Sequence, residues 1–380
     1  MYSLSRYLKE QSKTVLSKMS SLFCKPLSRS DTRRLTFLES VYGTDDFNLN
    51  YLKINGRETQ LQVTVSYPNT ILFRTKQSPD QNLLILPTGG ICVGKDIISN
   101  GFTGQQSYNV LGFCQSFSKA KRTISGTIIA NWPHRFLTYG DFILQLLPEF
   151  CLIKSMISHK EWLNARFIIP QTPKFLIEYL NLLGCSSSQI INSRNYCFNV
   201  LPEATIYFRE KDPMWFLCAP FDLTSITRSN FISNELRTSK GDRNGEILFV
   251  ERLGGYRKAV GLTKEVRARL KDIGVSFIDP ACISIEAQID AFAHAKMVVG
   301  IHGAGLANII WCKQNTRVIE IFHPNFSPWC YAILANQIGL EYYCLGGIPG
   351  HMNINFRESN VDVDWDGLHL LIQKLKNSIT

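Results

Sequence analysis

The residues best placed to do chemistry lie close together in the second half of the chain, where His302, Asn308 and Glu320 accompany Gly303 and Gly305. Glycine has no Cβ, so a ligand can approach the backbone there, and the free N–H groups at the start of a helix favour an anion. A histidine can donate to a phosphate or, when neutral, accept a proton. A glutamate at the end of a strand can accept both hydroxyls of a ribose. These residues therefore predict a phosphate or pyrophosphate site.

The elements that must hold these residues can be read from the same stretch. Residues 297–299 are a β-branched run typical of a buried parallel strand, a short helix is predicted at 306–311, and a second strand follows with Glu320 near its end. A nicotinamide dinucleotide fingerprint is the alternative. However, Asn308 stands at its third glycine position, and only 17 positions separate Gly303 from Glu320, against about 20 in that fingerprint. An NAD-dependent oxidoreductase is therefore the less favoured interpretation.

Two arginines offer further positive charge for an anion. Residues 246–252 form an apolar strand that runs into charged residues, with Arg252 at its carboxyl end and Arg257 in the loop that follows. Ligands of open α/β sheets bind beyond the carboxyl ends of the strands. We therefore predict that both arginines contact phosphate, although solvated surface charges would explain them equally simply.

Residues 302–308, HGAGLAN, followed by the strand that holds Glu320, resemble the signature of glycosyltransferase family 61. The resemblance implies a GT-B-like α/β fold, in which two Rossmann-like domains face a central cleft and a C-terminal helix crosses back. It also implies an inverting enzyme that moves a sugar from a nucleotide-sugar donor to a glycan or glycolipid acceptor. The predicted donor-binding residues are Arg252, Arg257, His302, Gly303, Ala304, Gly305, Leu306, Asn308 and Glu320.

A second part of the resemblance lies between residues 126 and 150. Family 61 enzymes commonly carry a tyrosine and then a histidine at this place, and here Tyr139 and Asp141 occupy the equivalent spacing. Asp141 is therefore our first candidate for the general base that takes the proton of the acceptor hydroxyl, and His302 is the second catalytic candidate. The acceptor-side candidates are His134, Arg135 and Tyr139, and other possible bases are Asp46, His134 and Glu149.

Length and patterning predict two domains. A chain of 380 residues can form two cores, and alternating strand and helix patterns favour parallel sheets covered by helices. We predict an acceptor-side domain at 35–242, a donor-binding domain at 243–350 and a tail with a helix at 351–380. The clearest predicted elements are strands at 165–170, 196–200, 246–252 and 275–280 and helices at 142–147, 173–183, 263–273, 284–295 and 365–379.

The distribution of charge separates the possible partners. The net charge is +10, which suits an anionic ligand, an anionic membrane or nucleic acid. Within the first 34 residues, eight lysines and arginines stand against two acidic residues, with apolar residues at helical spacing. This pattern predicts a basic amphipathic helix at residues 1–34 that lies on an anionic membrane or packs on the protein. Nucleic acid is not a predicted partner.

Targeting and cofactor signals are sparse. No apolar run is long enough to span a bilayer, the N-terminus lacks a signal-peptide pattern, and the 11 scattered cysteines include no CxxC. These features predict reduced thiols and a cytoplasmic protein that is peripheral on the cytosolic face of a membrane. Asp362, Asp364 and Asp366 resemble a metal-binding pattern, but helix capping explains them more simply. We predict no metal and no other cofactor.

The sequence thus predicts a hexosyl-, pentosyl- or N-acetylhexosaminyl-transferase in the biosynthesis of a surface or capsular polysaccharide. The main alternative is a non-catalytic relative that binds nucleotide or glycan, because Asp141 replaces the usual histidine.

Overall fold

The computed structural model describes residues 83–94, 96–98, 112–130, 138–210, 221–232, 246–252, 254, 256–347 and 353–377, together with short strands between residues 25 and 76. Contacts divide the chain into two compact units. Unit 1 comprises residues 1–46, 66–137 and 149–215, and unit 2 comprises residues 47–65, 138–148 and 216–380. The units are interleaved along the chain, whereas the sequence predicts a single boundary near residue 243. Of the basic helix predicted at residues 1–34, the structure describes only residues 25–27, which form a strand instead, and the other residues lie outside the described ones.

Unit 1 contains two mixed sheets. The first has the order β14 (Ile190–Asn192), β13 (Arg166–Ile169), β12 (Thr127–Ile129), β16 (Thr205–Glu210), β7 (Ile71–Lys76) and β2 (Leu38–Tyr42), and only β7 runs antiparallel to the other five strands. The second has the order β1 (Lys25–Leu27), β10 (Asp96–Ile98), β9 (Ile91–Val93), β8 (Leu83–Ile85), β15 (Tyr196–Val200) and β11 (Ala120–Ile124). One apolar cluster draws buried side chains from both sheets, including Ile85, Ile128 and Ile206. The strands predicted at 165–170 and 196–200 are confirmed.

The helix predicted at 142–147 is longer than the sequence indicates. Thr138 caps α4 (Tyr139–Asp141), a π-helical segment η1 (Phe142–Leu146) follows, and α5 (Leu147–Met156) continues without a break. The prediction that this helix ends at residue 147, just before Pro148, is therefore wrong. Proline has no N–H for the preceding turn, and a wider π turn is one way in which a helix accommodates the missing bond. Residues 138–148, which hold α4 and η1, belong to unit 2. After α5, unit 1 continues with α6 (His159–Asn164), α7 (Lys174–Leu182) and η2 (Ser187–Gln189), and α7 confirms the helix predicted at 173–183.

Unit 2 is built on a largely parallel sheet. Its order is β19 (Val275–Ile278), β17 (Ile247–Val250), β20 (Met297–Ile301), β21 (Arg317–Ile321), β22 (Glu341–Leu345), β4 (Leu52–Ile54) and β5 (Arg57–Thr59), with only β5 antiparallel to its neighbour. The connecting helices are α10 (Lys264–Asp272), α11 (Ile285–His294), the 3-10 helix η4 (Ala304–Trp311) and α12 (Cys330–Ile338). Smaller elements are α8 (Phe221–Phe231), η3 (Pro280–Cys282), η5 (Ile354–Phe356) and the strand pairs β3 (Phe47–Leu49) with β6 (Val63–Val65) and β18 (Ala259–Val260) with β23 (Val361–Asp362).

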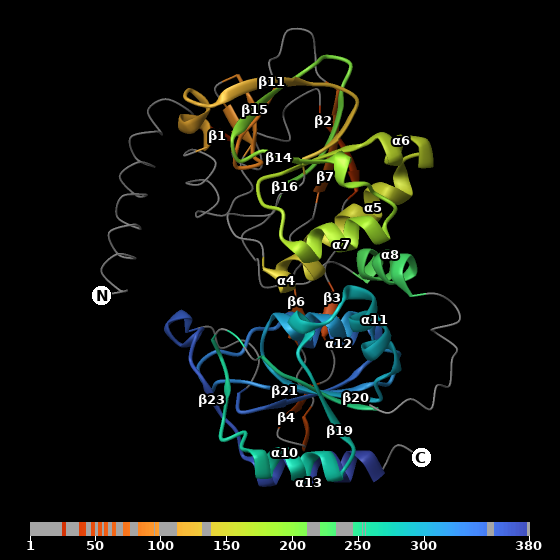
Figure 1. Cartoon of the computed structure of the whole chain (residues 1–380), viewed down its shortest axis with the longest axis vertical. Coiled ribbons are helices and arrows are strands. Elements are labelled where there is room, and N and C mark those ends of the chain that lie inside the picture. Colours follow the sequence, from red (N-terminus) through yellow and green to blue (C-terminus); the bar gives the residue numbers. More distant parts are fainter. Residues whose placement is uncertain are drawn as a thin grey trace. The chain divides into compact units, whose positions relative to one another are not determined.

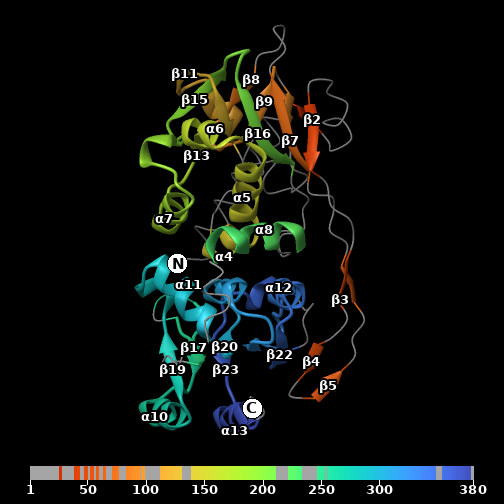
Figure 2. The ribbon, with the colours of Figure 1, turned by 90° about the vertical axis from the view of Figure 1, so that its right-hand side faces the viewer.

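This sheet is doubly wound. Numbered in chain order from β17, its first five strands are arranged 2-1-3-4-5, a common order of nucleotide-binding α/β folds. Helices α10 and α13 (Trp365–Asn377) lie on one face, and α11 and α12 lie on the other (Figures 1 and 2). The helices predicted at 263–273 and 284–295 are confirmed, and the side chains of Thr263 and Ser284 accept N–H bonds at the starts of α10 and α11. The mixed α/β architecture agrees with the predicted Rossmann-like class.

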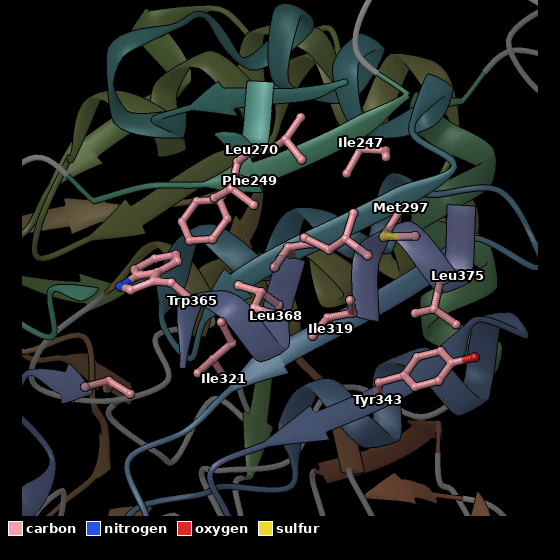
Figure 3. Close-up of a cluster of buried hydrophobic side chains, with 14 residues drawn as sticks. Ile247, Phe249, Leu270, Met297, Ile319, Ile321, Tyr343, Trp365, Leu368 and Leu375 are labelled. Atoms are coloured by element: carbon pink, nitrogen blue, oxygen red, sulfur yellow. The ribbon is translucent and has the colours of Figure 1, made fainter. Parts of the chain in front are cut away.

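The C-terminal helix belongs to unit 2. Trp365, Leu368, Ile372 and Leu375 recur along one stripe of α13 and pack with Phe249, Ile319 and Tyr343 in a single buried cluster (Figure 3). The prediction that this helix crosses back to the first domain is therefore wrong, because its apolar stripe covers the sheet of unit 2. At its start, Asp364 accepts the Gly367 N–H at 2.9 Å, as the capping interpretation requires.

Two other expectations concern the chain as a whole. Among the described residues, no helix has the length and apolar character to cross a bilayer. The cysteines in these residues are free thiols, and most are buried. Burial raises the pKa of the thiols of Cys185, Cys312 and Cys344 to about 12, so these three are unreactive side chains of the core.

Candidate functional site

A pocket of about 210 Å³ lies at the carboxyl ends of β17 and β20. The strand order reverses between these two strands, and open α/β sheets bind their ligands at such a switch point. His302, Gly303 and Gly305 line the pocket from the turn after β20, and Arg252 and Arg257 line it from the loop after β17. Sites that enclose a whole drug-sized ligand measure roughly 300–1,000 Å³. This pocket therefore suits a charged portion of a larger molecule.

The glycine turn packs closely against its surroundings. A Cβ on Gly305 would lie 3.1 Å from Val250 Cγ1, and a Cβ on Gly303 would lie 3.4 Å from Nη2 of Arg252. The absence of side chains thus lets β17 and an arginine approach the turn. The sequence predicts only that the glycines make room for a ligand. The Tyr331 hydroxyl donates to the Gly303 carbonyl at 2.7 Å and fixes the turn from α12. Leu306 also lines the pocket, and Ala304 begins η4.

The two arginines carry positive charge into the pocket. Nη1 of Arg252 donates to the Tyr256 carbonyl and Nη1 of Arg257 donates to the His302 carbonyl, both at 3.1 Å. Among the described residues, no carboxylate pairs with either of them. Arg267, which also lines the pocket, is by contrast paired with Glu251. Two guanidinium groups fixed by carbonyls and without counter-ions form a site for an anion.

Arg257 is the more constrained of the two. Burial, and then the charge of Arg252, lowers the pKa of the Arg257 guanidinium to about 10. Its backbone has φ of 62°, a left-handed conformation, and its guanidinium lies 5.4 Å from the centre of the Phe326 ring. Its Nε–H is buried with no hydrogen-bond partner among the described residues. A buried cation with an unused donor is costly unless a ligand satisfies it.

His302 is enclosed by aromatic and acidic side chains. Its Nδ1 lies 2.6 Å from Oε1 of Glu320, and the Tyr342 hydroxyl donates to Oε2 of the same carboxylate. The rings of Phe322 and Tyr331 stand 5.5 and 5.4 Å from the imidazole centre. Burial lowers the pKa of His302, although the hydrogen bond and charge of Glu320 act in the opposite direction. The imidazole is therefore neutral at neutral pH.

Glu320 is not the solvent-facing carboxylate that a ribose contact needs. It has no exposed surface, and His302 and Tyr342 occupy its two oxygens. Its position in the middle of a parallel sheet explains this burial, since β20 and β22 flank β21 on both sides. The geometry gives Glu320 a role in holding His302.

Asn308 lies in a buried polar network behind the turn. Its Oδ1 accepts from the Tyr139 hydroxyl at 2.6 Å, and its Nδ2 donates to Gln288 Oε1 at 3.0 Å and to the Gly305 carbonyl at 3.1 Å. Asn308 has no exposed surface. The network joins α4, α11 and η4 and holds the glycine turn in place. The sequence predicts that Asn308 binds the donor, but in the structure its side chain has this structural role instead.

Replacing Tyr139 with phenylalanine is expected to destabilise the protein by about 1–3 kcal/mol. The change removes the hydroxyl that donates a hydrogen bond to the buried Oδ1 of Asn308. That oxygen then loses this hydrogen bond and stays buried. Urea denaturation of the two proteins measures the difference. The control is Tyr256→Phe, whose side chain is 63% exposed and which should stay within about 0.5 kcal/mol. Equal stability of Tyr139→Phe and wild type would contradict the role assigned to the network.

Asp141 lies in the same unit as His302. Its Oδ2 accepts from the Thr138 hydroxyl at 2.7 Å and from the Thr138 N–H at 3.4 Å in a capping box. A Cβ on Gly140 would lie 3.4 Å from the Tyr331 hydroxyl oxygen, so α4 packs beside the glycine turn. The structure thus brings Tyr139 and Asp141 into unit 2 beside the pocket-lining turn, while His134 and Arg135 lie outside the described residues. Asp141 as base remains a proposal.

Residues 139–319 match the model of the family described as Glycosyltransferase 61. The match begins in α4, passes through β17 and the glycine turn, and ends in β21, so it includes the elements that bear the pocket. The pocket therefore lies in the part of the chain that matches glycosyltransferase family 61.

Two plant enzymes are similar over short segments. A β-1,2-xylosyltransferase of Arabidopsis thaliana is 34% identical over 65 residues, which are 17% of this chain and 12% of that enzyme. A β-1,2-xylosyltransferase of Oryza sativa subsp. japonica is 27% identical over 95 residues, 25% of this chain and 17% of that enzyme. The similarity therefore spans less than a fifth of either relative's length and supports a glycosyltransferase without fixing the sugar.

Three residues of this site escaped the sequence prediction. Gln288 bridges Asn308 and Tyr139, Tyr331 holds the Gly303 carbonyl, and Tyr342 bonds Glu320. None belongs to a recognisable motif, because each lies inside a regular helix or strand. Only Tyr342 carried a usable signal, since strand alternation places it on the same face as Glu320 once the two strands are known to be neighbours.

Proposed function

We propose that this protein is a family 61 glycosyltransferase that binds the diphosphate of a nucleotide-sugar donor in the switch-point pocket and transfers the sugar to a glycan or glycolipid. One observation carries the proposal: Arg252 and Arg257 line the pocket beside the glycine turn without a described carboxylate against either. Negative charge develops on the leaving phosphate as the sugar departs, and preorganised cations stabilise that charge.

In the proposed sugar transfer, the main task of the donor site is to stabilise the leaving phosphate. An acceptor oxygen attacks the anomeric carbon, the bond from that carbon to the phosphate oxygen breaks, and its electron pair stays with the phosphate. The acceptor proton passes to a base. A single displacement of this kind inverts the anomeric centre. In this proposal the two guanidinium groups provide the positive charge for the leaving group, and two Rossmann-like domains of GT-B type supply donor and acceptor.

The sugar and setting are inferred from other observations. Both plant relatives are β-1,2-xylosyltransferases, which favours a pentose, and xylose in particular. The basic N-terminal sequence favours a cytosolic membrane face, where a surface or capsular polysaccharide would be extended.

The donor proposal is tested with a panel of nucleoside diphosphates and nucleotide sugars, with NAD as comparison, by calorimetry and thermal unfolding. A ligand at about 100 times its dissociation constant should stabilise the protein by roughly 2.7 kcal/mol. Arg252→Ala should weaken the binding of that ligand by about 10- to 150-fold, because a hydrogen bond to a charged group contributes about 1.5–3 kcal/mol.

Arg269→Ala is the matched control. Arg269 pairs with Asp366 between α10 and α13, outside the pocket lining, so its loss should leave nucleotide affinity unchanged. Stabilisation by NAD alone, or equal affinity in Arg252→Ala and wild type, would contradict the proposal. A protein that binds nucleotide sugar but transfers nothing to a glycan panel would instead be the non-catalytic relative.

A further inference from the structure

We propose that Tyr342, Glu320 and His302 form a hydrogen-bonded chain that keeps His302 in the neutral Nδ1–H tautomer and presents its Nε2 to the pocket as the acceptor of a hydroxyl proton. Tyr342 and Glu320 are positioning residues in this chain. The identification of this hydroxyl as that of the sugar acceptor rests on the proposed function. The assignment of the His302 tautomer does not depend on it.

The fold places the three groups on one face of the sheet. In the parallel register Gly300 pairs with Glu320, and Val318 pairs with Tyr342. Alternation puts Gly300, His302, Glu320 and Tyr342 on the face away from α13, while Ile319 and Tyr343 join the cluster beneath it. Side chains from three neighbouring strand positions therefore meet without any backbone distortion.

The direction of the hydrogen bonds follows from chemistry. Burial raises the pKa of Tyr342 well above its ordinary value, so this group is a neutral phenol that donates to Oε2 of Glu320. A carboxylate has no proton to give, so the 2.6 Å contact between Oε1 and His302 requires that Nδ1 carry the hydrogen. In a neutral imidazole the lone pair then lies on Nε2.

Nε2 is the part of His302 left for a ligand. It has no hydrogen-bond partner among the described residues, the side chain keeps 10% of its surface exposed, and His302 lines the pocket. The backbone of the residue is fixed as well, because Arg257 binds its carbonyl. A lone pair attracts a hydroxyl hydrogen and repels a phosphate oxygen. Phosphate is therefore assigned to the arginines and a hydroxyl to His302.

In the transfer step the acceptor O–H bond breaks and its proton joins Nε2, while the acceptor oxygen bonds to the anomeric carbon and the phosphate leaves with the electron pair. Glu320 then faces an imidazolium, whose charge it stabilises, as the buried carboxylate of a serine-protease triad does. Asp141, the other candidate base, already serves its own capping box. The geometry therefore favours His302 over Asp141.

The tautomer is tested first, by ¹⁵N NMR of the full-length protein labelled at its seven histidines. Disappearance of a signal in His302→Gln assigns the ring. At pH 7 we expect a protonated Nδ1 and an unprotonated Nε2, with titration below the ordinary histidine range. A protonated Nε2 or a charged ring at pH 7 overturns the proposal, whatever the result of the nucleotide panel.

The positioning roles are tested by titrating His302 in variants, with Tyr343→Phe as matched control. Tyr343 is the next residue on the same strand, faces the other side and bonds Glu341 at 3.2 Å. Tyr342→Phe should raise the pKa of His302, because Glu320 loses a donor and attracts the imidazolium more strongly. Glu320→Gln should lower that pKa, because the negative charge is lost. Tyr343→Phe should leave the pKa of His302 unchanged.

Turnover should follow these shifts. The acid limb of the pH–rate profile should move up in Tyr342→Phe and down in Glu320→Gln, and Glu320→Gln should also lower kcat by about 100-fold or more. Nucleoside diphosphate affinity should be unchanged in both, which separates failure here from failure of the donor site. If Glu320→Gln does not fold, Tyr342→Phe decides alone. A titration of Tyr342→Phe that matches Tyr343→Phe overturns the role of Tyr342.

Discussion

Removal of the Arg257 side chain is expected to weaken nucleoside diphosphate binding by about 10- to 150-fold. Arg257 is the buried cation of the pocket, its Nε–H has no partner among the described residues, and burial lowers the pKa of its guanidinium to about 10. A phosphate would supply the missing hydrogen-bond acceptor and the counter-charge together. Calorimetry on Arg257→Ala and Arg257→Gly measures the loss, which should be the same for both.

The same two variants should differ in stability. Their backbone must adopt the left-handed conformation that Arg257 shows, with φ of 62°, and alanine resists it by about 1–2 kcal/mol more than glycine does. Arg257→Gly should therefore unfold at higher urea concentration than Arg257→Ala. Equal stability would show that the loop relaxes out of this conformation, and undiminished binding in both would remove Arg257 from the proposed donor site.

Gly346→Ala is expected to have the largest effect on stability, a loss of about 3–5 kcal/mol. Gly346 follows β22 with φ of 78°, and a Cβ there would overlap the carbonyl oxygen of Phe322. Backbone cannot move aside as a flexible side chain can. Because the Phe322 ring stacks on His302, the shift should also disturb the site. Urea denaturation measures the loss.

Gly184→Ala separates the two causes of that loss. Gly184 has φ of 86°, but a Cβ there would meet nothing within 4 Å. Gly184→Ala should therefore lower the free energy of unfolding only by the conformational cost of the left-handed backbone, about 1–2 kcal/mol. The excess in Gly346→Ala then measures the overlap with Phe322. Equal losses in the two variants would show that the turn at Gly346 yields and that the overlap is relieved at little cost.

The sequence by itself determined the elements and motifs that local chemistry encodes. The β-branched run before Gly300, the helix starts at Thr263 and Ser284 and the HGAGLAN turn all lie where the residue pattern predicts them. Arg252, Arg257 and His302 were predicted as site residues because they follow strands whose carboxyl ends share one edge of a parallel sheet, and the pocket contains all three. The predictions of strands and helices succeed because propensity, capping and strand periodicity act over a few residues.

The tertiary structure decided what each polar side chain does. Nothing local distinguishes a Glu320 that grips a ribose from one that orients His302, nor an Asn308 that binds donor from one that joins Tyr139 and Gln288. Those roles depend on which strands and helices become neighbours, and hence on contacts between residues far apart in the chain. The position of α13 also depends on the tertiary structure. Its apolar stripe could cover any exposed apolar sheet face, and in the structure it packs on the sheet of unit 2. Side-chain function here is set by burial and by partners, which only the folded chain brings together.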